Sequence, residues 1–345
     1  MGKSQKTLRA LTALAVAFTV ATLGTTGAAA KDFYKMSTLG PGSTPYVVMT
    51  AFAKVINQHV AGVEIQVNAT GAATRHAVDA AKDKIDFFMS APSVHHFMTR
   101  NLAMYKKMKD APKLAKKLRG IFNFPIGVYH VVVYEDSGIK SLADVKGKKV
   151  YLGPPAGAAR VIATSLVEGA TGYKAGQDFE AITMGWGAAS QAFQDRQFDV
   201  YINPTNAPSP VISQVALGNK IRILGLSEAD FKNPILSKTM KLPGRTVGSI
   251  APGTYGKNQT NSESVKSIGA WVGVGTRQGF SPDVMYRMTK AFWENLAEVH
   301  AVAPWLKAIA FETALQEMNM PLHPGAAKYY RERGVKLPAA LLAAD

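Results

Sequence analysis

The sequence predicts an α/β fold in which two lobes are joined by crossover strands at a hinge. Short apolar segments alternate with helical patterns along the chain, which is typical of folds that interleave strands and helices. This alternation restarts after a polar, turn-rich bridge at residues 137–148. A chain of 345 residues is also long for one ordinary core, which favours two domains.

The first half of the pattern predicts five strands and two helices. One helix starts at about Tyr46, because apolar residues from Val48 to Val60 recur at helical spacing. Another follows the turn at 69–73. Strands are expected at residues 33–37, 63–68, 85–89, 121–124 and 129–134. The last of these (YHVVVY) is apolar with little interruption, so we expect it to be buried.

The second half predicts a second sheet. Its strands are expected at residues 149–152, 179–183, 200–202 and 221–224, and its helices at 158–170 and around 189–193. The stretch 243–267, rich in Gly, Ser, Thr and Asn, indicates an irregular loop with one short strand.

The chain is then expected to return to the first lobe through a strand at 267–275. Ser281 and Pro282 form a good cap and first-turn pair for a helix whose apolar spacing continues to Leu296. We therefore assign residues 31–134 and 268–345, C-terminal helices included, to lobe 1 and residues 135–267 to lobe 2.

Residues 1–30 have the pattern of a cleaved signal peptide. A basic start without acidic residues precedes an apolar run at 11–23, and Ala28 and Ala30 supply the small side chains of a cleavage site. A membrane anchor is the alternative, but a spanning helix needs about 20 apolar residues. We expect the mature chain to lie in the periplasm without stable membrane insertion.

Composition narrows the class of partner. The chain has no cysteine, which excludes disulfides and thiol chemistry, and its formal net charge is +16. Such an excess of positive charge favours anionic ligands. Export of the chain disfavours nucleic acid as a partner. Lysines gather at 106–119 in a pattern that predicts an amphipathic helix broken near Pro112, which is either a solvated face or a docking patch.

Polar and glycine-rich turns are expected where strands enter helices, which is where open α/β sheets bind ligands. These turns lie at 41–45, 70–74, 90–93, 154–160, 185–190 and 203–209. The candidate ligand-binding residues on and near them are Ser43, Thr44, Tyr46, Thr70, Arg75, Ser90, Gly157, Arg160, Trp186, Asn203, Asn206 and Tyr255.

Each candidate role has a structural alternative. Arg75 is the strongest candidate for holding a carboxylate or sulfonate, and a solvent-facing helix arginine is the alternative. Arg160 can bind the anion or brace its own helix. The hydroxyl groups can donate to the ligand or cap helices. Trp186 can form a wall of the site or pack in the core, and the two asparagines can face the site or close their turn.

Catalysis has little support in the sequence. The phosphate-loop, dinucleotide, nucleophile-elbow and zinc-protease motifs are absent, and no pair of carboxylates suggests acid/base work. The adjacent His95 and His96 would project in different directions from a helix, which disfavours a shared metal. We therefore expect a binding protein with no metal and no cofactor, and not an enzyme.

Three segments carry a resemblance that covers essentially the whole mature chain. They are residues 137–153 (SGIKSLADVKGKKVYLG), residues 186–210, ending in VYINPTNAPSP, and residues 321–334 (PLHPGAAKYYRERG). With them the chain resembles the TAXI family of solute-binding proteins, which serve tripartite ATP-independent periplasmic (TRAP) transporters. The resemblance implies a periplasmic-binding-protein-like fold that closes on a small organic acid. It also implies a TRAP-type membrane permease as partner.

The chain departs from that family's pattern in its loops. Ala73 and His76 stand where a Ser and an Asn are common, and Ala91-Pro92-Ser93 replaces a Gln-Ser-Asp turn. In the second lobe, the turn at 156–159 has lost its usual hydroxyl residues. Because a site built for polar groups rejects ligands that lack them, we expect a pocket unlike the glutamate pocket of that family.

Other functions stay open at this point. A receptor for an ATP-driven importer of nitrate, sulfonate or phosphonate type has similar segments. A periplasmic enzyme on the same fold, or a ligand-sensing partner of a signalling receptor, is a further alternative.

Overall fold

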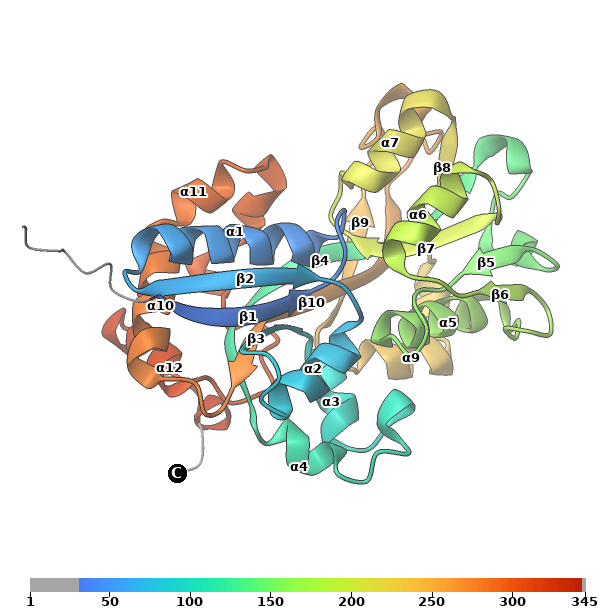
Figure 1. Ribbon diagram of the computed structural model, residues 1–345. Helices are drawn as coiled ribbons and strands as arrows, with labels where there is room; N and C mark the ends of the chain where they lie inside the picture. Colours follow the sequence, from blue (N-terminus) through green and yellow to red (C-terminus); the bar gives the residue numbers. More distant parts are fainter. Residues whose placement is uncertain (1–30, 343–345) are drawn as a thin grey trace, which may run out of the picture. The chain divides into compact units, whose positions relative to one another are not determined.

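Ten strands form one continuous mixed sheet in the computed structural model, which describes residues 31–342 (Figure 1). Their order is β2-β1-β3-β10-β4-β7-β5-β6, with β8 beside β4 and β9 beside β10. The strands are β1 (Asp32–Thr38), β2 (Val63–Ala69), β3 (Phe87–Ser90), β4 (Leu118–Tyr134), β5 (Lys149–Tyr151), β6 (Glu180–Ile182), β7 (Val200–Thr205), β8 (Ile221–Leu224), β9 (Arg245–Ile250) and β10 (Val265–Arg277). The predicted signal peptide lies outside the described residues.

Helices alternate with these strands, as the sequence pattern predicts. They are α1 (Thr44–His59), α2 (Ala73–Ala81), α3 (Pro92–Thr99), α4 (Ala111–Ala115), α5 (Ala158–Thr171), α6 (Trp186–Gln194), α7 (Pro210–Gly218), α8 (Glu228–Lys232), α9 (Pro234–Met240), α10 (Pro282–Glu294), α11 (Leu296–His300) and α12 (Pro324–Glu332). In the described part of the chain, none of them is long and apolar enough to cross a membrane.

Local chemistry explains several helix starts. The Ser281 side chain accepts a hydrogen bond from the Val284 N–H group, and Pro282 occupies the first turn of α10, as predicted. The Ser43 hydroxyl caps α1 in the same way. The predicted continuation of α10 to Leu296 is wrong, because the helix ends at Glu294 and α11 begins after Asn295.

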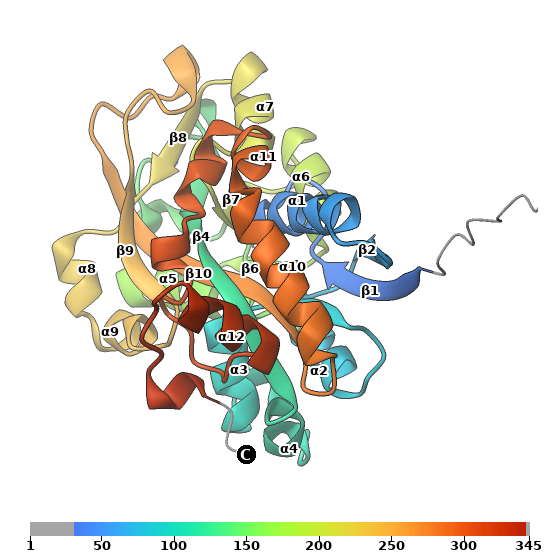
Figure 2. The same cartoon turned by 90° about the vertical axis from the view of Figure 1, so that its left-hand side faces the viewer.

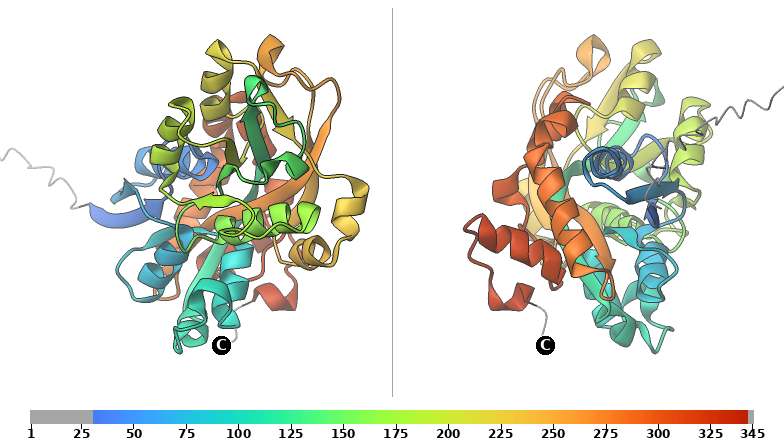
Figure 3. Two further views of the ribbon diagram at one scale, coloured as in Figure 1. Left: turned by 90° about the vertical axis from the view of Figure 1, so that its right-hand side faces the viewer. Right: turned by 60° about the vertical axis from the view of Figure 1, so that its left-hand side comes forward.

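The strands of the first half lie beside the C-terminal helices. β1 is parallel to both β2 and β3. Helix α10 packs against α1 and α12, and Figures 2 and 3 show the C-terminal helices gathered on this side of the sheet, away from α5 and α6. The aromatic rings of Phe52, Phe122 and Phe292 fill the core between them. The chain therefore returns to its first half after β10, as expected.

Two long antiparallel strands connect the halves of the sheet. One end of β10 pairs with β3 and the other end with β9, while the far end of β4 pairs with both β7 and β8. The sequence pattern instead predicts two separate strands at 121–124 and 129–134 and a second sheet. The predicted break is wrong, because Pro125 and Gly127 lie at an irregularity that the strand passes through without ending.

The close approach at Gly127 explains why that position has no side chain. Its φ is +93°, and a Cβ there would lie 2.1 Å from the Thr205 carbonyl oxygen on β7. The strands of both halves hydrogen-bond into one sheet, so the sheet itself marks no boundary between the two predicted lobes. The boundaries given for the lobes stay a prediction.

The lysine-rich segment differs from its predicted form. The sequence predicts an amphipathic helix broken near Pro112. The short helix α4 does begin at that point, with Pro112 in its first turn, but the part of the prediction before the break is wrong, because those residues form a 3-10 turn at Ala103–Tyr105 and a further turn. Asn101 stabilises this arrangement, since its side-chain amide donates to the carbonyl oxygens of Tyr105 and Met108. The lysines from Lys106 to Lys117 are exposed on it.

Candidate functional site

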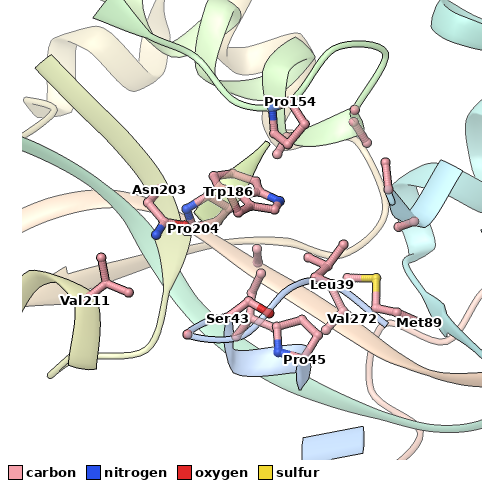
Figure 4. Close-up of a pocket in the computed structure, with 18 of the residues that line it drawn as sticks. Leu39, Ser43, Pro45, Met89, Pro154, Trp186, Asn203, Pro204, Val211 and Val272 are labelled. Carbon is pink, nitrogen blue, oxygen red and sulfur yellow. The ribbon is translucent and has the colours of Figure 1, made fainter. Parts of the chain in front are cut away.

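A cavity of about 310 Å³ lies where loops from both halves of the chain meet (Figure 4). This volume is at the lower end of the range of roughly 300–1,000 Å³ that small-molecule sites occupy. The loops that follow β1, β2, β3, β5 and β6 all contribute to its wall, each where it enters the next helix. The cavity therefore lies at the carboxyl ends of parallel strands, where open α/β sheets bind ligands.

Helices α1, α2, α3, α5 and α6 begin at this cavity, and Val211 in the first turn of α7 also lies on its wall. Helices α2, α3, α5 and α6 have an N-cap residue without a side-chain hydrogen bond: Ala72, Ala91, Gly157 and Gly185. Their first backbone N–H groups are therefore not satisfied by a capping side chain. Helix N-termini with such donors favour an anion nearby.

Arg245, the first residue of β9, is the only charged residue on the wall among the described residues. Its side chain is buried, with 9% relative exposure, and its Nε and Nη1 atoms make no hydrogen bond to a described protein group. Buried donors left unpaired cost about 1–3 kcal/mol each. A ligand that brings acceptor oxygens to these nitrogens would offset that cost, so the position favours an anion.

The neighbours of Arg245 fix its place on the wall. It pairs with Ala270 in the β9–β10 ladder, and Ala270 and Val272 both line the cavity. Gly244 has a φ of +79° and lies against α3, so a Cβ on it would sit 3.1 Å from the Pro92 ring. This places the Arg245 backbone close to the first residue of α3.

Tyr129 on β4 also lines the cavity and interacts with this arginine. Burial raises the pKa of Tyr129, and the positive charge of Arg245 opposes that rise. The phenol therefore stays protonated and neutral at physiological pH. A neutral Tyr129 phenol does not balance the positive charge of Arg245.

Apolar side chains dominate the rest of the wall. Figure 4 shows Leu39, Met89 and Val272 on one side of the cavity and Trp186 with Asn203 on the opposite side. Further apolar and aromatic lining residues are Pro41, Pro45, Val94, Ile126, Pro154, Tyr201, Pro204 and Val211.

The structure places four of the predicted site residues on the cavity wall: Ser43, Gly157, Trp186 and Asn203. The Ser43 hydroxyl donates to the Gly40 carbonyl oxygen and accepts from the Tyr46 N–H group. The Asn203 amide donates to the Tyr201 hydroxyl at 2.9 Å. Trp186 packs edge-on against Tyr151. These residues have both a place on the wall and a structural role.

Thr44 and Asn206 meet each other instead of lining the cavity. The Thr44 hydroxyl donates to Asn206 Oδ1 at 2.8 Å and accepts from the Asn206 N–H group at 3.2 Å, and both residues are buried. This pair joins the start of α1 to the loop after β7. A second bond joins α2 to the loop before α5, where the Thr74 hydroxyl donates to the Ala156 carbonyl oxygen at 3.2 Å. Both bonds hold together loops that enclose the cavity.

The two predicted arginines do not line the cavity. Arg75 donates from Nε to Asp79 Oδ2 at 2.8 Å, and its side chain is 71% exposed. Arg160 donates to the Thr183 hydroxyl. Thr70 and Tyr46 are also absent from the wall, and the Thr70 carbonyl oxygen accepts from His76.

Ser90 and Tyr255 are buried near the cavity but not on its wall. Ser90 lies beside Gly273 of β10, and its Oγ has no described partner. The Tyr255 hydroxyl accepts from the Ser209 N–H group at 3.1 Å and donates to His130 Nε2 at 2.7 Å, which makes His130 Nδ1 the donor to the Val128 carbonyl oxygen. Burial lowers the pKa of His130 to about 4, so this imidazole is neutral.

Arg245 is the residue that the sequence analysis missed. It stands in the stretch predicted to be an irregular loop with one short strand, and six residues of that stretch form β9. Its local pattern gives no sign of burial, because the pairing of β9 with β10 brings it to the cavity. The one available signal is that Arg245 directly follows the turn pair Pro243-Gly244, where a strand can begin.

Comparison with solved structures supports the fold. A structure described as a periplasmic transporter matches with a TM-score of 0.54 and 17% identity, over 87% of this chain and 92% of that chain. The alkanesulfonate-binding protein SsuA from Xanthomonas axonopodis pv. citri, bound to MOPS, gives a TM-score of 0.48 and 12% identity, over 92% and 98%. A TRAP periplasmic solute-binding protein from Shewanella oneidensis with bound succinate gives 0.47 and 13%, over 80% and 81%.

The predicted periplasmic-binding-protein-like α/β fold is thus confirmed by the strand–helix alternation, by the place of the cavity and by the first of these structures. The sequence comparison extends over most of the chain, since residues 36–334 match the model of the NMT1-like family. The chain belongs to the NMT1-like family.

Proposed function

We propose that the protein is a periplasmic solute receptor that holds a small organic anion in this cavity and delivers it to a membrane transporter. The observation that carries the proposal is Arg245, a buried cation with unpaired donors on a wall that has no acidic residue in the described chain. The helix starts at the same cavity add to the positive potential.

The same wall supports binding over catalysis. Among the described lining residues there is no histidine and no carboxylate that could exchange a proton with a ligand. The Ser43 hydroxyl is engaged with backbone groups, and the Tyr201 hydroxyl accepts from the Asn203 amide. We therefore propose a receptor and not an enzyme.

The transporter partner is proposed to be a TRAP-type permease. This assignment rests on the three segments that resemble the TAXI family, at residues 137–153, 186–210 and 321–334. The alternative is an ATP-driven importer of sulfonate type, because the solved structures with similar folds are described as serving both kinds of transporter. Neighbouring genes distinguish the two, since one system needs an ATPase and the other does not.

A thermal-shift screen of refolded protein tests the receptor function. Refolding removes any ligand carried through purification, and the library holds carboxylates, keto acids, amino acids, sulfonates and phosphonates. A ligand at a hundred times its dissociation constant adds about 2.7 kcal/mol of stability. A clear rise in melting temperature with one class of anion supports the proposal, and no rise with any anion contradicts it.

A further inference from the structure

We infer that the cavity selects an anion with one charged group and an apolar body, such as a medium-chain or aromatic monocarboxylate or sulfonate. The inference rests on the proposed receptor function and names the chemical class of its ligand. It follows from how charge, apolar surface and free hydrogen-bonding groups are distributed over the wall.

The charges on the wall match one anionic group. Arg245 is the only charged lining residue in the described chain, and its backbone lies close to the first residue of α3. A second carboxylate would lie against apolar side chains without a cation, and desolvating it there is costly. The ammonium group of an amino acid would meet no carboxylate. Dicarboxylates and amino acids therefore lack partners for their second charge.

Three of the four amide side chains on the described wall donate hydrogen bonds to the protein. Asn203 donates to Tyr201, and the Gln194 amide donates to the Ser190 carbonyl oxygen. The Gln191 amide donates to Asp195 at 3.0 Å. A sugar acid would need several such groups for its hydroxyls, and a polar group buried without a partner costs about 1–3 kcal/mol. The wall therefore disfavours a polyol chain.

The apolar lining residues give the ligand body its favourable contacts. Leu39, Met89 and Val272 form one side of the cavity and Trp186 stands opposite, so a hydrocarbon chain or ring is enclosed between them (Figure 4). Each buried methylene contributes about 0.8 kcal/mol, which is roughly fourfold in affinity. Affinity is therefore expected to grow with chain length until the cavity is full.

Calorimetry with matched six-carbon probes tests this class. Hexanoate, adipate, 6-aminohexanoate and gluconate share their chain length and one carboxylate, and they differ by a second carboxylate, an ammonium group or a row of hydroxyls. For the refolded full-length chain we expect hexanoate to bind at least tenfold more tightly than each of the others. Acetate, butanoate and hexanoate are expected to gain roughly fourfold per methylene.

Variants of two arginines separate this inference from the receptor function. R245Q is expected to weaken hexanoate at least tenfold and to leave neutral hexanamide within twofold. R287Q makes the same change on α10, away from the wall, and is expected to leave both unchanged. If R245Q fails to fold, R245K keeps the charge and alters the donor geometry, and the probe series in the unmodified chain stands without either variant.

Three results overturn what is proposed here. Tighter binding of adipate, 6-aminohexanoate or gluconate than of hexanoate, with dependence on Arg245, overturns the ligand class and leaves the receptor function in place. Affinity that does not change from acetate to hexanoate overturns the apolar body. No binding of any anion overturns the receptor function itself.

Discussion

Arg245 is the residue on which the account of the cavity depends. Its guanidinium group is buried and forms no ion pair with a described residue, which is an unfavourable arrangement without a ligand. Binding sites commonly hold such groups at a cost in stability, because the ligand supplies the missing partner.

The first prediction follows from this cost. R245M keeps a long side chain and removes the unpaired donors, so the ligand-free protein is expected to be at least as stable as the unmodified one. The free energy of unfolding in urea, measured after refolding without ligand, checks this. A loss of more than about 1 kcal/mol would mean that the arginine is needed for the fold.

The second prediction concerns Arg75, the strongest candidate from the sequence. Its ion pair with Asp79 and its exposed side chain make it a helix-surface residue in the structure. R75Q is expected to change the affinity for the anion that R245Q weakens by less than twofold. Isothermal titration of both variants gives the comparison, and a tenfold loss in R75Q would restore Arg75 to the site.

At the scale of elements, the loops around the cavity are held by a few specific bonds. The Thr44–Asn206 pair ties α1 to the loop after β7, and neither residue lines the cavity. The positions of the loops around the cavity therefore depend on hydrogen bonds between residues that do not line the cavity.

The third prediction tests this pair. T44V removes both bonds and leaves the buried Asn206 backbone N–H group without its acceptor, so ligand affinity is expected to fall several-fold, chiefly through faster dissociation. T50V is the matched control, because Thr50 lies on the same helix and its buried hydroxyl has no described partner. Stopped-flow measurements that show equal dissociation rates for both variants would contradict a role of the pair in closure.

Elements differ in how far local sequence determines them. The cap at Ser281 was predictable because its hydrogen bond is local. The course of β4 through Pro125 and Gly127 was not, since pairing with β10 and β7 outweighs the turn preference of those residues. The part of the lysine-rich segment before Pro112 was predicted wrongly for a related reason: the bonds from Asn101 stabilise a turn where periodicity favours a helix.

The same division holds for the site. The turns at 41–45, 154–160 and 185–190 reach the cavity because parallel strands end at one edge of a sheet, and that rule needs only the order of elements. Arg245 reaches it through the antiparallel register of β9 on β10, which local sequence does not specify.

At the scale of the whole molecule, three of the four buried histidines in the described chain have a strongly lowered pKa. Burial lowers the pKa of His95, His130 and His323 to about 4 in each case. They lie on α3, on β4 and before α12, so the effect is spread over the fold. In the unfolded chain each has a pKa near 6.5 and takes up a proton more readily.

The fourth prediction is therefore an acid-sensitive fold. The unfolded state binds more protons than the native state between about pH 6.5 and pH 4, so stability is lost as the pH falls through that window. Each histidine contributes a loss of up to about 2 kcal/mol at pH 5. Urea unfolding at pH 7.5 and pH 5 measures the sum, and equal stability at both would show that these imidazoles are not held neutral.

The central claim is that an anionic group is held at Arg245 inside the cavity. A crystal structure of the protein with the anion that most raises its melting temperature tests it most directly. The account predicts carboxylate or sulfonate oxygens within hydrogen-bond distance of the Arg245 guanidinium, with the body of the ligand between Trp186 and Val272. A ligand ordered outside this cavity, or one that turns a neutral group toward Arg245, would contradict it.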